Sequence, residues 1–281
     1  MATLKEIAEK NVREHLRDNP CRGLVLGLGE NGSQMQVSWI MGRSENSQNR
    51  VYTVQNGILK TEAADPSKVK DPRLIIYNVM RSTVSGLHVV SNGDQTDTVC
   101  SANSEFANSN SLYLESVRAQ FFRALAKRYC EPDAPNFTPR ITGYHDSRQI
   151  DVVGLSVLKA EPFARNRWIE TEAKIKAGDA SAVHKYSKNE FPTIGDEFMR
   201  AVEPGFGYML TTYMPGSKEL PSFQGEPLLV PMRGTLEESM QTFWDALEPS
   251  FRVAVGGREI NPDSVRYAQP INRFTKIEVK E

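Results

Sequence analysis

Apolar runs alternate with short polar turns over the first hundred residues, a pattern that predicts antiparallel β-sheet. Asn31-Gly32 and Asn56-Gly57 are dipeptides typical of tight hairpins. The strands expected from this pattern cover residues 22–28, 34–41, 51–55, 58–60, 74–81 and 87–90. The run at 74–81 is apolar enough to predict a strand that is buried on both faces.

From Ser111 the hydrophobic period changes from that of a strand to that of a helix. The apolar positions are Leu114, Val117, Phe121 and Leu125, followed by either Arg128 or Tyr129. This spacing predicts a helix over 112–129 with one buried face.

Capping boxes predict the start of two further helices. Thr3-Leu4-Lys5-Glu6 opens a helix over 3–18, which we expect to dock as an N-terminal appendage, and Thr235-Leu236-Glu237-Glu238 opens one over 236–248. The charged region 163–203 offers only two helix candidates, at 168–176 and 180–186. Further strands are expected at 140–145, 150–158, 208–213, 228–230, 251–255 and 274–279.

This order of elements predicts an α+β protein with much antiparallel sheet, as in a four-layer αββα sandwich, although periodicity alone supports only the α+β class. No repeat or linker divides the chain, so a single domain over 1–281 is expected.

Charge and cysteine content exclude several classes of partner and site. With 34 basic and 35 acidic side chains, the net charge is −1, so no global field attracts nucleic acid or an anionic membrane. The three cysteines are odd in number and far apart, which argues against a disulfide framework, and with the four histidines they show no metal-ligand spacing. No segment has the length of a transmembrane helix or a signal peptide's apolar core, so we expect a cytoplasmic protein without a metal site.

The loop 42–50 is the first candidate for chemistry, because it is wholly polar from Arg43 to Arg50 and lies between two expected strands. An arginine at each end, with amides and hydroxyls between, suits a phosphate or another planar anion. Gly42 is expected to give the backbone angles that other residues resist. The alternative is an ordinary solvated hairpin loop.

A period of two places Arg73, Tyr77 and Arg81 on one face of the expected strand 74–81 and its flank, with Asn78 on the other. Their shared face indicates a lined cleft, unless the arginines are simply strand ends in solvent. Ser91-Asn92-Gly93 suits a carboxamide or a ring nitrogen, or forms an ordinary turn.

Glu131 and Asp133 lie two residues apart in a loop stiffened by three prolines. Close carboxylates repel, so one of them can keep a proton near neutral pH and serve in acid–base catalysis; the alternative is a solvated loop.

The chain has no Gly-x-Ser-x-Gly elbow, dinucleotide-binding glycine motif or Walker A motif. Met1-Ala2 offers no N-terminal nucleophile, because removal of the methionine leaves alanine.

Several segments, in order, resemble the archaeal-type IMP cyclohydrolase family and its bacterial IMP cyclohydrolase-like relatives. The matching segments are Gly42-Arg43-Ser44 to Asn49-Arg50, 77–81, Ser91-Asn92-Gly93 with Asp97, Glu131-x-Asp133, 138–141, 204–208, Thr212-Tyr213 and 223–227. The resemblance covers residues 22–230. It implies a four-layer αββα sandwich similar to N-terminal nucleophile hydrolases, without the terminal nucleophile. Compared with the compact archaeal enzymes, the chain has an insert around 160–200 and a C-terminal extension.

The resemblance further implies ring closure of 5-formamidoimidazole-4-carboxamide ribotide to IMP, with a small purine ribotide as substrate and no cofactor or metal. Glu131 and Asp133 are then expected to transfer protons, Tyr77 to donate to the formyl oxygen and Arg50 to support developing negative charge. The expected substrate-binding residues are Arg43, Arg81 and Arg140 for the phosphate, Asn78, Asn92 and Thr138 for the base, and Asn49 and Gly93 beside them. Asn78 fits only if a β-bulge reverses its side.

Two other functions stay open at this point. One is a purine-ribotide binding or regulatory protein without turnover. The other is a hydrolase of a different amide that uses an internal nucleophile such as Ser44 or Thr138. Neither nucleic acid nor a membrane is an expected partner, and the sequence leaves open whether the chain forms a homo-oligomer.

Overall fold

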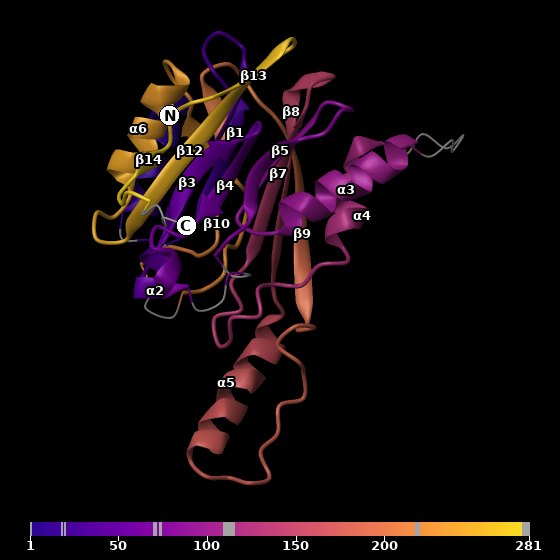
Figure 1. Ribbon diagram of the computed structural model, residues 1–281, viewed down its shortest axis with the longest axis vertical. Coiled ribbons are helices and arrows are strands. Elements are labelled where there is room, and N and C mark those ends of the chain that lie inside the picture. Colours follow the sequence, from indigo (N-terminus) through magenta and orange to yellow (C-terminus); the bar gives the residue numbers. More distant parts are fainter. Residues whose placement is uncertain are drawn as a thin grey trace.

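Two seven-stranded antiparallel sheets form the body of the protein in the computed structural model (Figure 1). The structure describes residues 2–17, 19, 21–69, 72, 75–108, 116–216 and 220–276. In the first sheet the order is β11 (Leu228–Pro231), β10 (Phe206–Thr211), β1 (Gly23–Leu28), β2 (Gln34–Met41), β12 (Arg252–Asn261) and β13 (Ser264–Tyr267), and β14 (Ile271–Asn272) also pairs with β12. In the second sheet the strands follow chain order: β3 (Val51–Gln55), β4 (Ile58–Glu62), β5 (Asn78–Ser82), β6 (Leu87–Ser91), β7 (Arg140–Asp146), β8 (Gln149–Ala160) and β9 (Thr193–Ala201).

The sheets pack face to face through alternate side chains of their central strands. In β1, Leu24 and Leu26 point to the second sheet, where they meet Ile141 and Leu155, while Val25 points to the other face. Every residue of β1 and β2 is buried, so both faces of the first sheet are covered.

Helices cover the outer faces. α1 (Leu4–Leu16) and α6 (Leu236–Ala246) pack on the first sheet, whereas α3 (Gln95–Asn108) and α4 (Val117–Leu125) pack on the second. α5 (Pro162–Lys176) projects beyond the end of the second sheet (Figure 1). Two single-turn helices, α2 (Glu45–Gln48) and a 3-10 turn (Pro66–Lys68), lie in loops. The fold is thus α+β, compatible with the predicted sandwich, and no described helix is long and apolar enough to span a membrane.

The predicted strand 74–81 is wrong in its first half. Residues 75–77 form no strand, and β5 begins at Asn78. The hydroxyl of Thr61 donates to the carbonyl of Ile75 at 2.6 Å and accepts from the amide of Tyr77 at 2.9 Å. A side chain therefore takes up the backbone groups that a strand ladder would use. Residues 73 and 74 lie outside the described part.

Other differences concern segments with weak patterning. The helix expected at 112–129 is α4, which begins at Val117 and ends at Leu125, while residues 112–115 lie outside the described part. The helix expected at 180–186 is absent from that range. α3 and β9 were not expected, because α3 is largely polar and β9 is a half-exposed edge strand.

The C-terminal strand expected at 274–279 is also not found where the structure describes it. Residues 274–276 are in no strand, and the remainder lie outside the described part. Instead β12 runs on to Asn261 and turns into β13, and the short β14 pairs back on β12.

Candidate active site

A cavity of about 400 Å³ lies where the ends of β1, β2 and β10 meet the loop 131–138. Five of the residues expected to bind or transform a ligand line it together: Arg43, Arg50, Glu131, Asp133 and Thr138. Arg22, Ser44, Asn46, Ser47, Asn136 and Tyr213 also line it. Segments more than a hundred residues apart therefore form one cationic and acidic pocket.

The polar loop after β2 forms one wall of this cavity and folds into α2. Ser44 is the N-cap of that short helix, and its hydroxyl accepts from the amide of Ser47 at 3.2 Å. Arg43 is exposed beside it, where its guanidinium can meet an anion that enters from solvent.

Gly42 is needed in this loop for space, and the expectation that it supplies unusual backbone angles is wrong. Its φ is not in the left-handed region, which eight other described glycines occupy. A Cβ at Gly42 would lie only 2.6 Å from the backbone carbon of Ser47 and 2.7 Å from the amide nitrogen of Gln48. The start of the loop therefore packs against the backbone of α2 too closely for a side chain.

Arg50 is buried at the inner end of the loop with part of its guanidinium uncommitted. Its Nε donates to the carbonyl of Ser47 at 2.8 Å and its Nη2 to that of Met41 at 3.2 Å. Nη1 makes no hydrogen bond to the described residues. Burial lowers the pKa of Arg50, and the charge of Arg22 acts in the same direction, but arginine stays protonated at neutral pH.

Arg22 and Glu131 form a buried ion pair on the opposite wall. Nη2 of Arg22 lies 2.7 Å from Oε2 of Glu131, and the two side chains are only 11% and 9% exposed. Nη1 of Arg22 also donates to the carbonyl of Asn92 at 3.0 Å. Burial alone would lower the pKa of Arg22, but Glu131 and the nearby Tyr77 raise it well above its ordinary value.

Asp133 is the side chain whose protonation is most altered by the site. Burial and then the repulsion of Glu131 raise the pKa of Asp133 to about 6. The amide and the hydroxyl of Thr138 donate to its two oxygens at 2.7 and 2.5 Å, which opposes the rise. With a pKa of about 6, this carboxyl group is half protonated near pH 6 and keeps its proton in roughly a tenth of the molecules at pH 7.

Tyr213 continues the contacts of Asp133 across the cavity. Its hydroxyl lies 2.6 Å from Oγ1 of Thr138. Burial, and next the charge of Asp133, raise the pKa of Tyr213 to about 12, so the phenol stays protonated. Asp133, Thr138 and Tyr213 thus form a chain of hydrogen-bonding groups along which a proton can be shared.

Tyr77, expected to be catalytic, is not among the residues that line the cavity. It is buried, and its hydroxyl has no hydrogen-bond partner among the described residues. Its electrostatic effect on both Arg22 and Arg50 places it next to these two guanidinium groups. The hydroxyl is therefore available for a donor role.

Asn49, Asn92 and Gly93 do not line this cavity. Asn49 donates to the carbonyl of Asp65 at 2.8 Å and accepts from the amide of the same residue at 2.7 Å. Asn92 donates to the carbonyl of Pro139 at 2.9 Å and accepts from the amide of Ile141 at 2.9 Å. These asparagine side chains tie loops together.

Arg140, Arg81 and Asn78 are also outside the cavity lining, and each contacts an aspartate near the start of α3. Arg140 binds Asp94 at 2.6 Å, and its Nη1 lies 2.8 Å from where a Cβ of Gly93 would stand. Arg81 and Asn78 both donate to Asp97, Asn78 at 3.0 Å. A register shift between β4 and β5 lies beside Asn78, but the side chain of Asn78 binds Asp97 and does not line the cavity.

Sequence reasoning missed Arg22 and Tyr213 as site residues. Arg22 immediately precedes the fully buried strand β1, and Tyr213 follows β10 and belongs to the Thr212-Tyr213 segment of the family resemblance, but neither feature assigned a role to the side chain. The partner of Arg22 is 109 residues away in the chain, a separation that no local pattern can bridge. Among the described residues, no group of three His, Cys, Asp or Glu side chains could hold a metal ion.

Residues 20–263 match the family model described as IMP cyclohydrolase-like protein. The match includes every residue named above as lining the cavity. No curated protein matches the chain.

Proposed function

The chain belongs to the IMP cyclohydrolase-like protein family, and from this premise we propose that it closes the ring of 5-formamidoimidazole-4-carboxamide ribotide to form IMP and water. One observation carries the proposal. Two carboxyl groups, one of them with a pKa raised to about 6, share a cavity with three guanidinium groups. Such a site can exchange protons with a neutral base ring and hold a phosphate at the same time.

The reaction moves two protons onto the oxygen that leaves. The carboxamide nitrogen attacks the formyl carbon and gives up one proton, a C–N bond forms, and the formyl oxygen becomes a hydroxyl group. The formamide nitrogen then loses its proton as the C=N bond of the new ring forms, and the hydroxyl group takes up a second proton and leaves as water. In our proposal Glu131 accepts the proton from the attacking nitrogen. Asp133, whose raised pKa of about 6 keeps part of it protonated near neutral pH, protonates the departing hydroxyl group.

Charge develops on the former formyl oxygen before water leaves. The uncommitted Nη1 of Arg50 and the unpartnered hydroxyl of Tyr77 are the two donors that we assign to this oxygen. Arg22 holds Glu131 in place through the 2.7 Å ion pair. Arg22 is thus a positioning residue in this scheme.

For the ribotide phosphate we favour Arg43, which is exposed at the cavity and has no ion-pair partner in the described ranges. Arg81 and Arg140 fit this role less well, because Asp97 and Asp94 already neutralise them. Thr138 remains our candidate for contact with the base. A fold similar to N-terminal nucleophile hydrolases and a place in purine biosynthesis belong to this proposal too.

Paired substitutions test the acid–base assignment. Glu131→Gln combined with Asp133→Asn should lower turnover of the formamido ribotide by a factor of about 10²–10⁴, the usual contribution of general acid–base catalysis. Asp94→Asn is a matched control, because Asp94 is also an arginine-paired carboxylate but does not line the cavity. Full turnover in the double variant would refute the assignment.

One contact favours a second candidate, an amide hydrolase that uses Thr138 as nucleophile. Its hydroxyl is 2.5 Å from Asp133, a carboxylate whose raised pKa suits a general base. Such an enzyme forms an acyl ester on Thr138, which intact-mass measurement of acid-quenched protein would reveal. A ring closure leaves the protein mass unchanged throughout turnover.

A further inference from the structure

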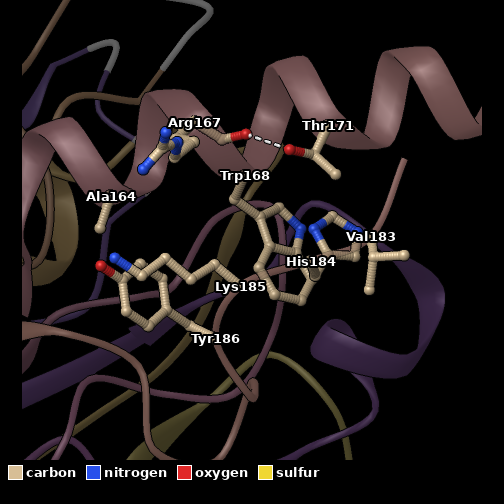
Figure 2. Close-up of a pocket in the computed structure, with 8 residues that line it drawn as sticks. All are labelled: Ala164, Arg167, Trp168, Thr171, Val183, His184, Lys185 and Tyr186. Carbon is tan, nitrogen blue, oxygen red and sulfur yellow. Dashed lines mark hydrogen bonds between the residues drawn. The ribbon is translucent and has the colours of Figure 1, made fainter. Parts of the chain in front are cut away.

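A second cavity, of about 390 Å³, lies under the projecting helix α5 and shares no lining residue with the candidate active site. One side is a face of α5, with Arg167, Trp168 and Thr171 (Figure 2). The other side is the loop that returns toward β9, with His184, Lys185 and Tyr186. The reaction proposed above makes no use of this cavity.

Aromatic rings form its floor. The rings of Trp168 and His184 stack with centroids 3.6 Å apart and planes 9° from parallel (Figure 2). Glu172 fixes the histidine through a 2.9 Å contact with Nε2. Nδ1 of the same ring is buried and, within the described ranges, has no hydrogen-bond partner. This nitrogen could therefore still form one hydrogen bond.

Other aromatic rings pack against the stacked pair of Trp168 and His184. Trp168 meets Phe137 edge to face at 5.3 Å, and Phe137 stacks on Phe191 at 3.8 Å. Trp168 itself is only 7% exposed. The ligand therefore reaches this stacked pair through the half-buried ring of His184, with Tyr186 also lining the cavity, and it meets rings that are already held in place.

Three cations without carboxylate partners lie in or near the cavity. Lys185 lies over Tyr186 at 5.2 Å, and Lys188, outside the lining, lies over Trp168 at 5.9 Å. Arg167 lines the cavity, and its guanidinium also lies over the ring of Phe163, outside the lining, at 6.0 Å. None of the three cations forms an ion pair with the described residues. Their charge can therefore be directed to a bound anion.

We propose that this cavity binds a small planar ring that carries a phosphate group, of about the size of a mononucleotide. The rings supply stacking, and Arg167 and Lys185 supply charge-assisted hydrogen bonds to phosphate. The volume falls at the lower end of the range for small-molecule pockets and suits one ring system. The inference does not depend on the reaction proposed for the other cavity.

Calorimetric titration with AMP, adenosine and inorganic phosphate tests this inference on the intact chain. AMP should bind more tightly than adenosine or phosphate alone, because only AMP uses both the rings and the cations. Arg167→Ala with Lys185→Ala should weaken AMP binding about tenfold or more, as loss of charged contacts predicts. Both side chains are exposed, so folding should be unaffected. Lys174→Ala, another exposed cation of α5 outside the cavity, should have no effect.

Tryptophan fluorescence locates the binding event. AMP stacked in this cavity should change the emission of Trp168, and Trp168→Phe should remove that change while the other two tryptophans remain. An Arg43→Ala variant should keep the signal, which separates this cavity from the candidate active site. Equal AMP affinity in the double variant, or a signal that persists in Trp168→Phe, would overturn the proposal. Much tighter binding of a single-stranded oligonucleotide than of AMP would also overturn it, in favour of nucleic acid.

Discussion

Asp133 gives the site a dependence of stability on pH that can be worked out from its surroundings. An unperturbed aspartate has a pKa near 4, and burial together with Glu131 raises that of Asp133 to about 6. The folded protein therefore holds this proton more tightly than the unfolded chain does. A difference of about two units corresponds to roughly 3 kcal/mol.

The sign of the effect follows from linkage. Below about pH 4 the group is protonated in both states, and its stabilising effect is fully present. As pH rises from about 4 through 6, the unfolded chain releases the proton first, so the free energy of unfolding loses up to roughly 3 kcal/mol from this group. Because asparagine does not titrate, the Asp133→Asn variant does not lose this unfolding free energy as pH rises.

Urea unfolding of both proteins between pH 4 and pH 7 measures the effect. The difference in unfolding free energy, variant minus parent, should rise by up to roughly 3 kcal/mol over this range. Asp94→Asn is the control: Arg140 and Arg128 overcome the effect of burial and lower the pKa of Asp94, so its stabilising effect is lost only below about pH 4. Its difference should therefore stay nearly flat between pH 4 and pH 7. A flat or falling difference for Asp133→Asn would refute the assigned protonation.

Three further changes test the remaining parts of the site. Arg22→Met should lower the free energy of unfolding by about 3–5 kcal/mol, because it leaves the carboxylate of Glu131 buried without its partner, and adding Glu131→Gln should recover much of that loss in urea melts. Gly42→Ala should destabilise the fold by about 1–3 kcal/mol in the same assay, since its Cβ would press on the backbone of α2. In steady-state kinetics, Arg43→Ala should raise KM for the ribotide about tenfold and leave kcat nearly unchanged. The reason is that the phosphate contact is equally strong in the ground state and in the transition state, so its loss weakens both equally.

Elements with a strong local signal were predictable from the sequence. The capping boxes at Thr3 and Thr235 are both formed, and they open α1 and α6. β1 and β2 follow their apolar runs on either side of an Asn-Gly turn. In these segments burial, propensity and turn chemistry all favour the same structure.

Elements stabilised mainly by tertiary contacts were not predictable. α3 has a largely polar sequence, yet Val99 and Cys100 pack it onto the second sheet. β9 has exposed residues along much of its length and is held by its pairing with β8. A local pattern carries little information on either contact.

The candidate site shows the same division. Arg50 lies in the polar loop between β2 and β3, and Glu131, Asp133 and Thr138 lie in the loop between α4 and β7, so their loops can be recognised from the sequence. Arg81 and Arg140 lie in β5 and β7, where Asp97 and Asp94 bind them. The sequence shows that a guanidinium is present and leaves open which carboxylate neutralises it.

Turnover of 5-formamidoimidazole-4-carboxamide ribotide, followed by absorbance with and without a chelator of divalent metals, is the most direct test of the proposed function. The proposal predicts IMP formation at the same rate in both conditions. Binding of the ribotide without turnover would contradict it and favour the regulatory alternative. Absence of binding would show that the cavity formed by Arg22, Arg50, Glu131 and Asp133 serves another ligand.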